Sequence, residues 1–483
     1  MKVEIMGYTD LRDWIEQVEA MGELRRIRGA DWKHEISAVA DISSHPVLFD
    51  EINGYPAGYR ILTNPSKSLR AWLLTVSMST AAQGKNLNRE WRERLRRLQP
   101  LSAKIVEGGP VMENVLLGSD ADLLRFPAPL WHERDAGRYI GTADAVVMRD
   151  REEGWVNLGN YRLQVHDPKT LGLYICYGKH GEGILEKYHS RGEPCPVVVL
   201  LGGDPALLLA SILHVPWGVS EYGFAGGLKG APLEVIPGPL TGLPIPAAAE
   251  IALEGEIPPH EFRMEGPFGE WTGYSEPRPA PIIRVKAIYH RDNPILLGQL
   301  PRQLSRPTQA KLKGDFCFGG MIWDEIERAG ARDVQAVATY SRFLIAVSIK
   351  QRYAGQARQA GLLASQCHSG GFMGRYVVVV DEDVDPFNLD EVIWAILFRA
   401  DPQRAIEILR YCWTDQMDSI HYAGRPEAEK GYNSRCIIDA CTPVEWKKQA
   451  KVPVEVSSET RQRILEKWGD SISPSSFVGS FGR

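Results

Sequence analysis

The sequence has no long hydrophobic run. No window approaches the roughly 18 uncharged apolar residues that a membrane-spanning helix requires, and the longest apolar stretches, at 196–202 and 376–380, have the length of buried strands. The first residues, MKVEIMGYTDLRDW, carry acidic side chains where a signal peptide would have its apolar region. We therefore expect a cytoplasmic protein that has no membrane partner.

A strong excess of one charge and a cysteine framework are also missing. The net charge is −5, and the 44% hydrophobic and 24% charged fractions are those of a globular protein, with no reason to expect a nucleic-acid partner. The seven cysteines show no CxxC spacing, which argues against a disulfide framework and against a thiolate zinc site. We expect them to be small buried hydrophobic residues.

The length of 483 residues predicts two to four domains. An amphipathic helix begins after Asp10, a candidate N-cap, and Gly22 can end it. A second helix, near 88–99, is rich in arginine, and we interpret it as a solvated or subunit-facing helix rather than an anion-binding face. The Pro-rich stretch at 126–129 indicates a domain boundary near residues 120–130.

The middle and the last third of the sequence differ in pattern. Short β-type runs separated by loops rich in Gly, Pro and Asp predict a mainly β middle domain with inserted helices. They lie at 143–148, 197–201, 233–236 and 282–290. After residue 300, predicted strands alternate with predicted helices, which is the order of a parallel layered sheet. The strands lie at 344–349 and 376–380, and the helices at 321–329, 356–367, 389–400 and 457–468.

Two polar clusters in the middle segment hold candidate ligands. Asn157 and Arg162 lie five residues apart in a predicted strand and loop, so both can reach one pocket. His180 and Glu221 each lie among glycines that let the backbone approach a phosphate. An amide oxygen, an imidazole and a carboxylate suit manganese or magnesium better than zinc, and an arginine suits a carboxylate or a phosphate. A structural role remains the simpler explanation for each residue taken alone.

A third cluster pairs two carboxylates. Glu265 and Glu270 lie five residues apart across the sequence Gly-Pro-Phe-Gly, which cannot be a regular helix. Such a turn can fold both carboxyls toward one cavity, where one of them can hold a proton for donation near neutral pH. A surface hairpin with two solvated acids explains this cluster alone equally well.

The clusters follow one order along the chain: Trp-x-Asn-x4-Arg, then His, then Glu-x3-Ala-Gly, then Glu-Gly-Pro-Phe-Gly-Glu-x-x-Gly-Tyr. In this order they resemble the UbiD family of prenylated-FMN-dependent (de)carboxylases. The resemblance extends to Leu201-Gly-Gly-Asp-Pro-Ala206 and Asp381-Glu-Asp-x-Asp385, and it covers nearly the whole chain to about residue 445. The Glu-Gly-Pro-Phe-Gly-Glu element is quite specific.

The resemblance implies a fold of the α/β (α+β) class with three domains. An N-terminal α+β domain would span 1–120, and a central split β-barrel that binds the prenylated flavin would span 121–305. A C-terminal α/β dimerisation domain with a terminal helix and tail would span 306–483.

The resemblance also implies site residues, by position in the motifs. The catalytic acid–base network falls on Arg162, Glu265 and Glu270, with Glu270 as the proton donor. A divalent metal, manganese or magnesium, that bridges to the flavin phosphate falls on Asn157, His180 and Glu221. The flavin itself would contact Asn160, Tyr161, Arg162, Lys179 and Arg358, the last standing where some relatives carry lysine. A potassium ion would be held near Trp155, Ala210, Ser211 and Leu213.

The implied activity is the reversible, non-oxidative decarboxylation of an aromatic, heteroaromatic or α,β-unsaturated carboxylic acid, with an aryl-CoA acid as a further option. Glu270 would protonate the vacated carbon. A flavin prenyltransferase would supply the prenylated FMN, and the protein would be a homodimer or homohexamer. Two alternatives stay open: a prenyl-flavin carrier or chaperone of the same fold, and a metal hydrolase without flavin.

Overall fold

The structure is a computed structural model that describes residues 7–213, 215–300, 315–421, 431–447, 454 and 456–469. It divides into two compact units. The first contains Met1–Gln351 with Gly355–Cys441, and the second contains Arg352–Ala354 with Thr442–Arg483. The second unit holds helix α13 (Ser458–Trp468), which lies within the helix predicted at 457–468 and has Ser457 as its N-cap. The elements described below belong to the first unit.

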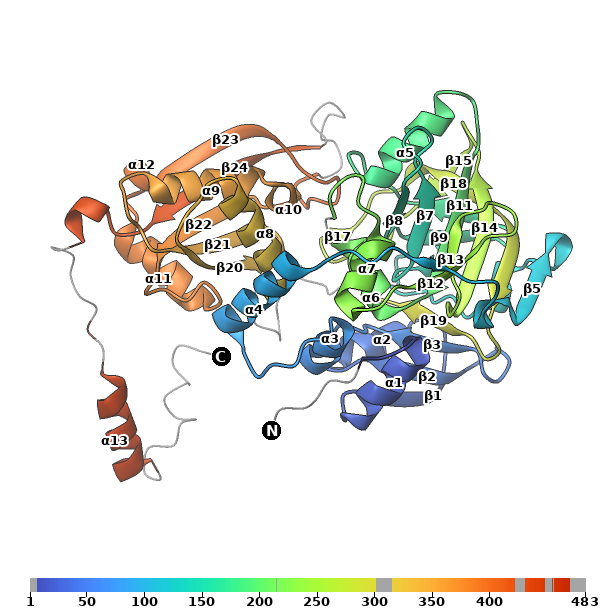
Figure 1. The fold of residues 1–483 in the computed structure, drawn as a ribbon, viewed down its shortest axis with the longest axis horizontal. Coiled ribbons are helices and arrows are strands. Elements are labelled where there is room, and N and C mark those ends of the chain that lie inside the picture. Colours follow the sequence, from blue (N-terminus) through green and yellow to red (C-terminus); the bar gives the residue numbers. More distant parts are fainter. Residues whose placement is uncertain are drawn as a thin grey trace. The chain divides into compact units, whose positions relative to one another are not determined.

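The N-terminal segment begins with the predicted amphipathic helix. The side chain of Asp10 accepts a hydrogen bond from the Asp13 N–H and caps α1 (Leu11–Ala20), and Gly22 follows with a φ of 75°. Helices α2 (Glu35–Ile42) and α3 (Leu69–Thr75) flank a four-stranded sheet (Figure 1). In spatial order its strands are β1 (Arg25–Ala30), β2 (Val47–Ile52), β3 (Arg60–Thr63) and β19 (Ile295–Gly298). Strand β19 therefore joins this sheet from the far end of the middle segment.

The arginine-rich helix is α4 (Gly84–Arg97), and one of its faces is buried against the same chain. The indole N–H of Trp91 donates to the Cys317 carbonyl at 3.0 Å, and Arg92 forms an ion pair with Glu327. Both partners belong to α8 (Phe316–Arg328). Arg89, Arg96 and Arg97 are exposed, in agreement with a solvated helix, whereas the intrachain burial of Trp91 and Arg92 was not predicted.

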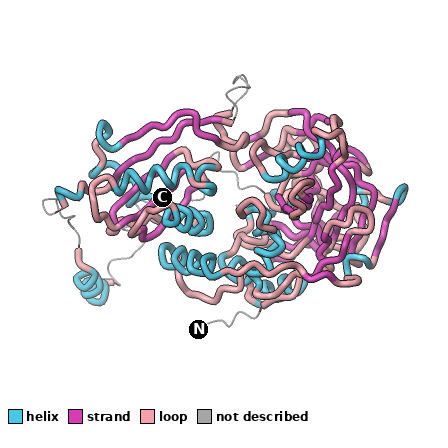
Figure 2. Tube along the Cα trace, turned by 45° about the horizontal axis from the view of Figure 1, so that its top comes forward, coloured by secondary structure: helices cyan, strands magenta, loops and turns pink. Residues whose placement is uncertain are grey.

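A ten-stranded sheet dominates the middle segment and curls into a half-open barrel (Figures 1 and 2). Its path runs through β6 (Tyr139–Gly141), β9 (Leu163–Asp167), β10 (Thr170–Leu173), β18 (Arg278–His290), β14 (Ile251–Ile257), β11 (Cys195–Gly202), β7 (Ala145–Arg149) and β8 (Val156–Gly159). Strands β5 (Asn114–Leu117) and β15 (Phe262–Glu265) also pair with β18. The expected α/β (α+β) class with a central barrel-like sheet is confirmed.

The apolar run at 196–202 is explained by burial on both faces of this sheet. Val197 and Val199 of β11 belong to one hydrophobic core, whereas Val198 and Leu200 belong to another. A strand covered on both faces has a continuous apolar run instead of an alternating one.

Helices α5 (His180–His189), α6 (Pro205–Ile212) and α7 (Glu221–Lys229) all contact β8. A small sheet of β13 (Pro244–Pro246), β12 (Glu234–Pro237) and β4 (Lys104–Ile105) completes this part.

The C-terminal sheet has the order β20 (Val334–Tyr340), β21 (Leu344–Ile349), β22 (Tyr376–Asp381), β24 (Tyr432–Ala440), β23 (Ile406–Trp413). The three central strands are parallel, as predicted, but β20 and β23 are antiparallel to their neighbours. A tight turn joins β20 to β21, and only antiparallel strands can be joined in that way. The helices of this domain are α8, α9 (Gln356–Gln366), α10 (His368–Gly371), α11 (Leu389–Arg399) and α12 (Pro402–Ala405).

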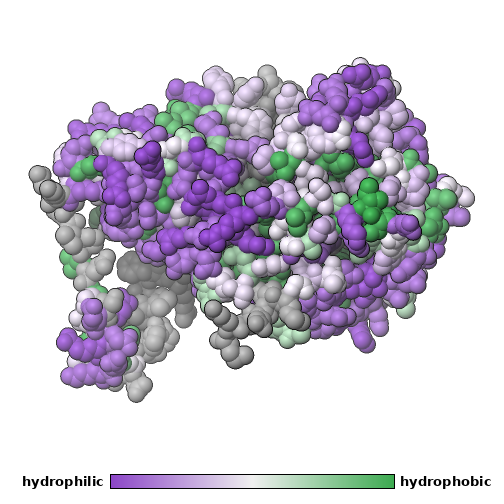
Figure 3. Space-filling view, viewed as in Figure 1, coloured by the Kyte–Doolittle hydropathy of each residue, from purple (hydrophilic) through white to green (hydrophobic). Residues whose placement is uncertain are grey.

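The surface seen in Figure 3 is mostly hydrophilic, with apolar side chains exposed over β5, where Val115 and Leu117 point outward. Among the helices in the described ranges, none is both long enough and apolar enough to cross a membrane.

Candidate active site

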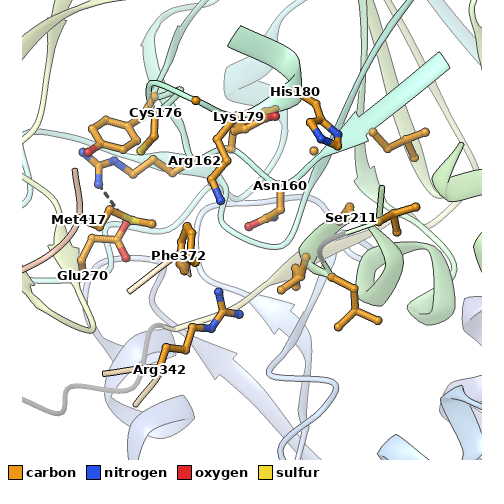
Figure 4. A pocket seen from close by; sticks show the side chains of 18 of the residues that line it. Asn160, Arg162, Cys176, Lys179, His180, Ser211, Glu270, Arg342, Phe372 and Met417 are labelled. Atoms are coloured by element: carbon orange, nitrogen blue, oxygen red, sulfur yellow. Dashed lines mark hydrogen bonds and ion pairs between the residues drawn. The ribbon is translucent and has the colours of Figure 1, made fainter. Parts of the chain in front are cut away.

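One cavity of about 500 Å³ lies against the curled sheet, and its volume falls within the roughly 300–1,000 Å³ of cofactor and ligand pockets. Its walls come from the β8–β9 connection, the starts of α5 and α7, the end of α6, and the C-terminal domain (Figure 4). The lining includes most of the residues that the sequence singled out: Asn157, Asn160, Tyr161, Arg162, Lys179, His180, Ser211, Leu213, Glu221 and Glu270.

Arg162 joins the two predicted carboxylates into one network. Its Nε and Nη2 atoms donate to the two oxygens of Glu265 at 2.8 Å each, and its Nη1 donates to Glu270 Oε1 at 2.9 Å. Burial lowers the pKa of Arg162, but hydrogen bonding and attraction from Glu265 outweigh it and raise the pKa above its usual value. The guanidinium therefore stays charged between the two acids.

The two acids differ in their access to the cavity. The Glu265 side chain is completely buried and also accepts a hydrogen bond from the Tyr139 hydroxyl at 2.9 Å. The Glu270 side chain keeps 11% of its surface exposed and lines the cavity. Glu265 is therefore placed to hold Arg162, and Glu270 is the carboxyl of the pair that a molecule in the cavity can reach.

The Gly-Pro turn produces this arrangement. Glu265 ends β15, Gly266 turns the chain with a φ of 85°, and Glu270 lies in the short strand β16 (Gly269–Glu270), which pairs with β17 (Gly273–Tyr274). Ser275 closes the turn, because its Oγ accepts hydrogen bonds from the Phe268 N–H at 3.0 Å and from Arg162 Nη2 at 3.1 Å. The two acids are thus part of a buried network and not of a solvated surface hairpin.

Sequence reasoning missed three supporting residues. Besides Tyr139 and Ser275, Tyr174 lies under the Arg162 guanidinium, with 3.6 Å between Cζ and the ring centroid. Ser275 directly follows the Glu-Gly-Pro motif, so its position offered a signal. Tyr139 lies on β6 and Tyr174 directly after β10, and nothing local in the sequence connects them with Arg162.

The three predicted metal ligands all line the cavity. Asn157 lies in β8, while His180 and Glu221 are the first residues of α5 and α7. Glu221 is buried and accepts a hydrogen bond from the Leu158 N–H at 2.8 Å. Burial raises the pKa of Glu221 to about 8 and lowers the pKa of His180 to about 4. The imidazole is therefore neutral and able to act as a ligand at neutral pH.

The same residues fit a divalent cation on chemical grounds. The buried Asn157 amide nitrogen has no hydrogen-bond partner among the described residues, and the amide can be turned so that its oxygen takes that place. One imidazole nitrogen, one carboxylate and one amide oxygen form a mixed set that suits manganese or magnesium. In the described part of the chain, no cluster of three His, Cys, Asp or Glu side chains could hold a metal, so an ion here would depend on Asn157.

The remaining predicted residues occupy different positions around the cavity. Asn160 is fixed by its amide, which donates to the Asp144 carbonyl at 2.8 Å, and the Tyr161 hydroxyl accepts from the Gly181 N–H at 3.2 Å. Lys179 lines the cavity, with its Nζ 3.8 Å from Asp415 Oδ2. Trp155 packs edge-on against His180, and Ala210 is buried in α6, so neither of these two side chains lines the cavity.

Arg358 lies outside the cavity, in contrast to its predicted contact with the flavin. It is on α9, forms an ion pair with Glu407 at 3.1 Å and donates to the Arg404 carbonyl at 2.8 Å. A motif places a residue along a helix but does not determine which face of the helix turns toward a cavity.

Comparison with known proteins identifies the family. Three family models match the chain: the 3-octaprenyl-4-hydroxybenzoate carboxy-lyase N-terminal domain at 15–94, the Rift-related domain at 104–303 and the C-terminal domain at 321–440. A phenolic acid decarboxylase of Streptomyces sp. is 31% identical over 91% of this chain and 93% of its own. A pyrrole-2-carboxylic acid decarboxylase of Pseudomonas aeruginosa is 31% identical over 77% of this chain and 78% of its own.

Solved structures agree in fold. The vanillic acid decarboxylase of Sedimentibacter hydroxybenzoicus in its closed form matches with a TM-score of 0.82 at 26% identity, covering 97% of this chain and 100% of that chain. The UbiD-class enzyme HmfF of Pelotomaculum thermopropionicum, in complex with FMN, matches with a TM-score of 0.79 at 25% identity, again covering 97% of this chain and 100% of that chain. The family models, the relatives and the Arg–Glu network in the cavity agree, and the chain belongs to the UbiD family of carboxy-lyases.

Proposed function

We propose that the protein catalyses the reversible, non-oxidative decarboxylation of an aromatic or heteroaromatic carboxylic acid with prenylated FMN as cofactor. The observation that carries the proposal is the Arg162–Glu265–Glu270 network at the wall of the cavity. Relatives named as phenolic acid and pyrrole-2-carboxylic acid decarboxylases, and a UbiD-class neighbour whose structure contains prenylated FMN, support the substrate class and the cofactor. An α,β-unsaturated acid or an aryl-CoA acid would need the same chemistry.

The cavity has the size and the donors for a flavin nucleotide. Asn157, His180 and Glu221 would hold Mn²⁺ or Mg²⁺ at its phosphate, and the backbone near Ser211 and Leu213, with that of Trp155 and Ala210, would hold K⁺. Prenylated FMN, when bound, supplies the electron sink that loss of CO2 from an sp2 carbon requires. The protein's own side chains must then orient the carboxylate and deliver a proton.

After its hydrogen bonds to the described residues, Arg162 has one donor left for a substrate. A guanidinium carries five N–H groups, and Glu265 takes two of them, Ser275 one and Glu270 one. The fifth N–H is on Nη1, the same nitrogen that donates to Glu270. A substrate carboxylate that accepts this N–H therefore lies beside the Glu270 carboxyl.

Glu270 is placed to deliver the proton. Its Oε1 accepts the hydrogen bond from Arg162, and its Oε2 accepts none from the described residues. The free oxygen can carry a proton to the carbon that CO2 leaves, and general acid catalysis of this kind contributes about 10²–10⁴-fold in rate. The rings of Phe268, Trp271 and Phe372 line the same cavity and give a planar substrate apolar walls.

The test is to purify the protein from cells with and without a co-expressed flavin prenyltransferase, our proposed supplier of the cofactor. Each preparation is assayed for CO2 release from a panel of aromatic, heteroaromatic and α,β-unsaturated acids. We expect turnover only in the preparation that carries the absorbance of the prenylated flavin. A flavin-loaded protein that releases no CO2 from any acid would indicate a carrier, and full activity in a colourless protein would indicate a metal hydrolase.

Assembly and location remain part of the proposal. We propose a cytoplasmic homodimer or homohexamer, and the neighbour described as an evolved dimeric form of a UbiD-class enzyme supports self-association within this fold. Sedimentation velocity of the holoenzyme would distinguish the two assemblies from a monomer.

A further inference from the structure

A second arginine lines the cavity in addition to Arg162. Arg342 comes from the C-terminal domain, in the turn between β20 and β21. Figure 4 shows its side chain extending toward the cavity from the side opposite to that of Lys179 and Asn160. It takes no part in the Arg162 network and lies apart from the predicted metal ligands, so the proposed chemistry leaves this charge unexplained.

Among the described residues, the Arg342 charge has no dedicated partner. Its Cζ lies 3.8 Å from the Phe318 ring centroid and 5.3 Å from that of Phe372, and no described residue forms an ion pair or a hydrogen bond with its guanidinium. Two nearby carboxylates have other partners: Asp315 accepts the Cys317 N–H at 2.7 Å, and Asp415 pairs with Lys179. Burial lowers the pKa of Arg342, so the protein holds this charge against its desolvation.

The backbone at this position is also unfavourable for the residues present. Ser341 and Arg342 have φ angles of 51° and 58°, and the Phe343 N–H donates to the Tyr340 carbonyl at 3.1 Å. A β-turn whose two central residues both have positive φ angles prefers asparagine and glycine at those positions. Side chains kept in such conformations occur frequently at ligand-binding positions, where function compensates for the strain. An arginine here is therefore better explained by a ligand than by the turn.

We propose that Arg342 binds a second anionic group of the substrate, and that the substrate is an aromatic or heteroaromatic dicarboxylate. This inference rests on the proposed function, in which Arg162 and Glu270 bind the carboxylate that leaves. The planar guanidinium, stacked on Phe318, presents its N–H edges to a carboxylate in the two-pronged geometry that such groups favour. A neutral ring substituent such as a hydroxyl would leave the charge uncompensated, whereas a second carboxylate neutralises it.

The test compares paired acids on the holoenzyme: benzoate with benzene-1,4-dicarboxylate, and furan-2-carboxylate with furan-2,5-dicarboxylate. Affinity is measured by quenching of tryptophan fluorescence, because Trp271 and Trp413 line the cavity, and kcat/KM is measured by CO2 release. The variants are Arg342→Met, which keeps an apolar stem over Phe318, and Arg342→Lys, which keeps the charge. Arg328→Met is the matched control, because Arg328 is 71% exposed on α8 and its ion pair among the described residues is with Asp324.

We expect the wild type and Arg328→Met to bind the dicarboxylate of each pair about ten- to a hundredfold more tightly than the monocarboxylate, the usual effect of hydrogen bonds to a charged group. Arg342→Met should abolish this preference without weakening monocarboxylate binding, and Arg342→Lys should keep part of it. Equal affinities in the wild type, or a preference that survives in Arg342→Met, would overturn the inference.

Two further outcomes separate this inference from neighbouring explanations. If Arg342→Met loses flavin and weakens both acids of a pair alike, Arg342 holds the cofactor phosphate and the inference is wrong. If the wild type selects dicarboxylates through Arg342 but releases CO2 from none of the acids, the proposed decarboxylation fails while the assignment of Arg342 stands.

Discussion

Replacing Glu265 with glutamine should destabilise the protein strongly, although the side chain keeps its size and shape. Glu265 is completely buried and accepts three hydrogen bonds, two from Arg162 and one from the Tyr139 hydroxyl. Glutamine replaces one acceptor oxygen with an NH2 group, which then faces N–H or O–H donors. The Arg162 charge would remain buried with only Glu270 opposite it.

Removing one partner of a buried ion pair costs about 3–5 kcal/mol. Because Glu270 still accepts a hydrogen bond from Arg162 at 2.9 Å, we expect Glu265→Gln to lower the free energy of unfolding by about 3 kcal/mol, the lower end of that range. The matched control is Glu261→Gln, four residues upstream. Glu261 also pairs with an arginine, Arg284, but both side chains are well exposed, at 39% and 52%. Its loss should therefore cost no more than about 1 kcal/mol.

The assay is urea unfolding of the apoprotein, followed by tryptophan fluorescence, with both variants measured beside the wild type. Apoprotein is used so that loss of cofactor binding does not enter the comparison. Equal destabilisation by the two substitutions would refute the reasoning, because the Glu265 pair would then be no stronger than a surface pair.

Three other variants or conditions test other parts of the site. Arg162→Lys should lower kcat by about 10²-fold, because one ammonium cannot hold Glu265 and Glu270 together, and steady-state CO2 release near the wild-type rate would contradict this. Mn²⁺ affinity of the apoprotein, measured by calorimetry, should rise about tenfold per pH unit up to about pH 8 and level off above it, because burial raises the pKa of Glu221 to about 8 and the proton competes with the cation. An affinity independent of pH would argue against Glu221 as a ligand. Gly181→Ala should lower the thermal midpoint, because the added Cβ would lie 2.7 Å from Met148 Cε and from the Tyr161 hydroxyl. Its control is Gly183→Ala in the same helix, where the added Cβ meets nothing closer than 3.9 Å, and which should be neutral or stabilising by about 0.5–1 kcal/mol.

Features that depend on local sequence were predictable. Asp10 caps α1 as expected, and the strand predicted at 344–349 is β21 with the same bounds. Capping, strand periodicity and turn residues act over a few positions, so one segment of sequence contains the whole signal. The Gly-Pro turn between Glu265 and Glu270 is of the same kind, and it does bring the two acids to a common arginine.

Features that depend on pairing between distant segments were not predictable. The addition of β19 to the N-terminal sheet and the antiparallel edge strands of the C-terminal sheet are set by long-range contacts. The positions of Tyr139 beside Glu265 and of Arg342 at the cavity have the same origin. For Arg358, the motif predicted a position at the cofactor, whereas in the structure its side chain pairs with Glu407 and does not line the cavity.

The role of Glu270 tests the account most directly. Glu270→Gln holoenzyme is compared with the wild type at equal flavin content, by CO2 release and by deuterium uptake at the vacated carbon in D2O. We predict that the variant retains its cofactor, because none of the proposed flavin or metal ligands is changed, and that turnover and deuterium uptake both fall by about 10²–10⁴-fold. Wild-type turnover in Glu270→Gln would contradict the assignment of Glu270 as the proton donor and, with it, the proposed use of the Arg162 network.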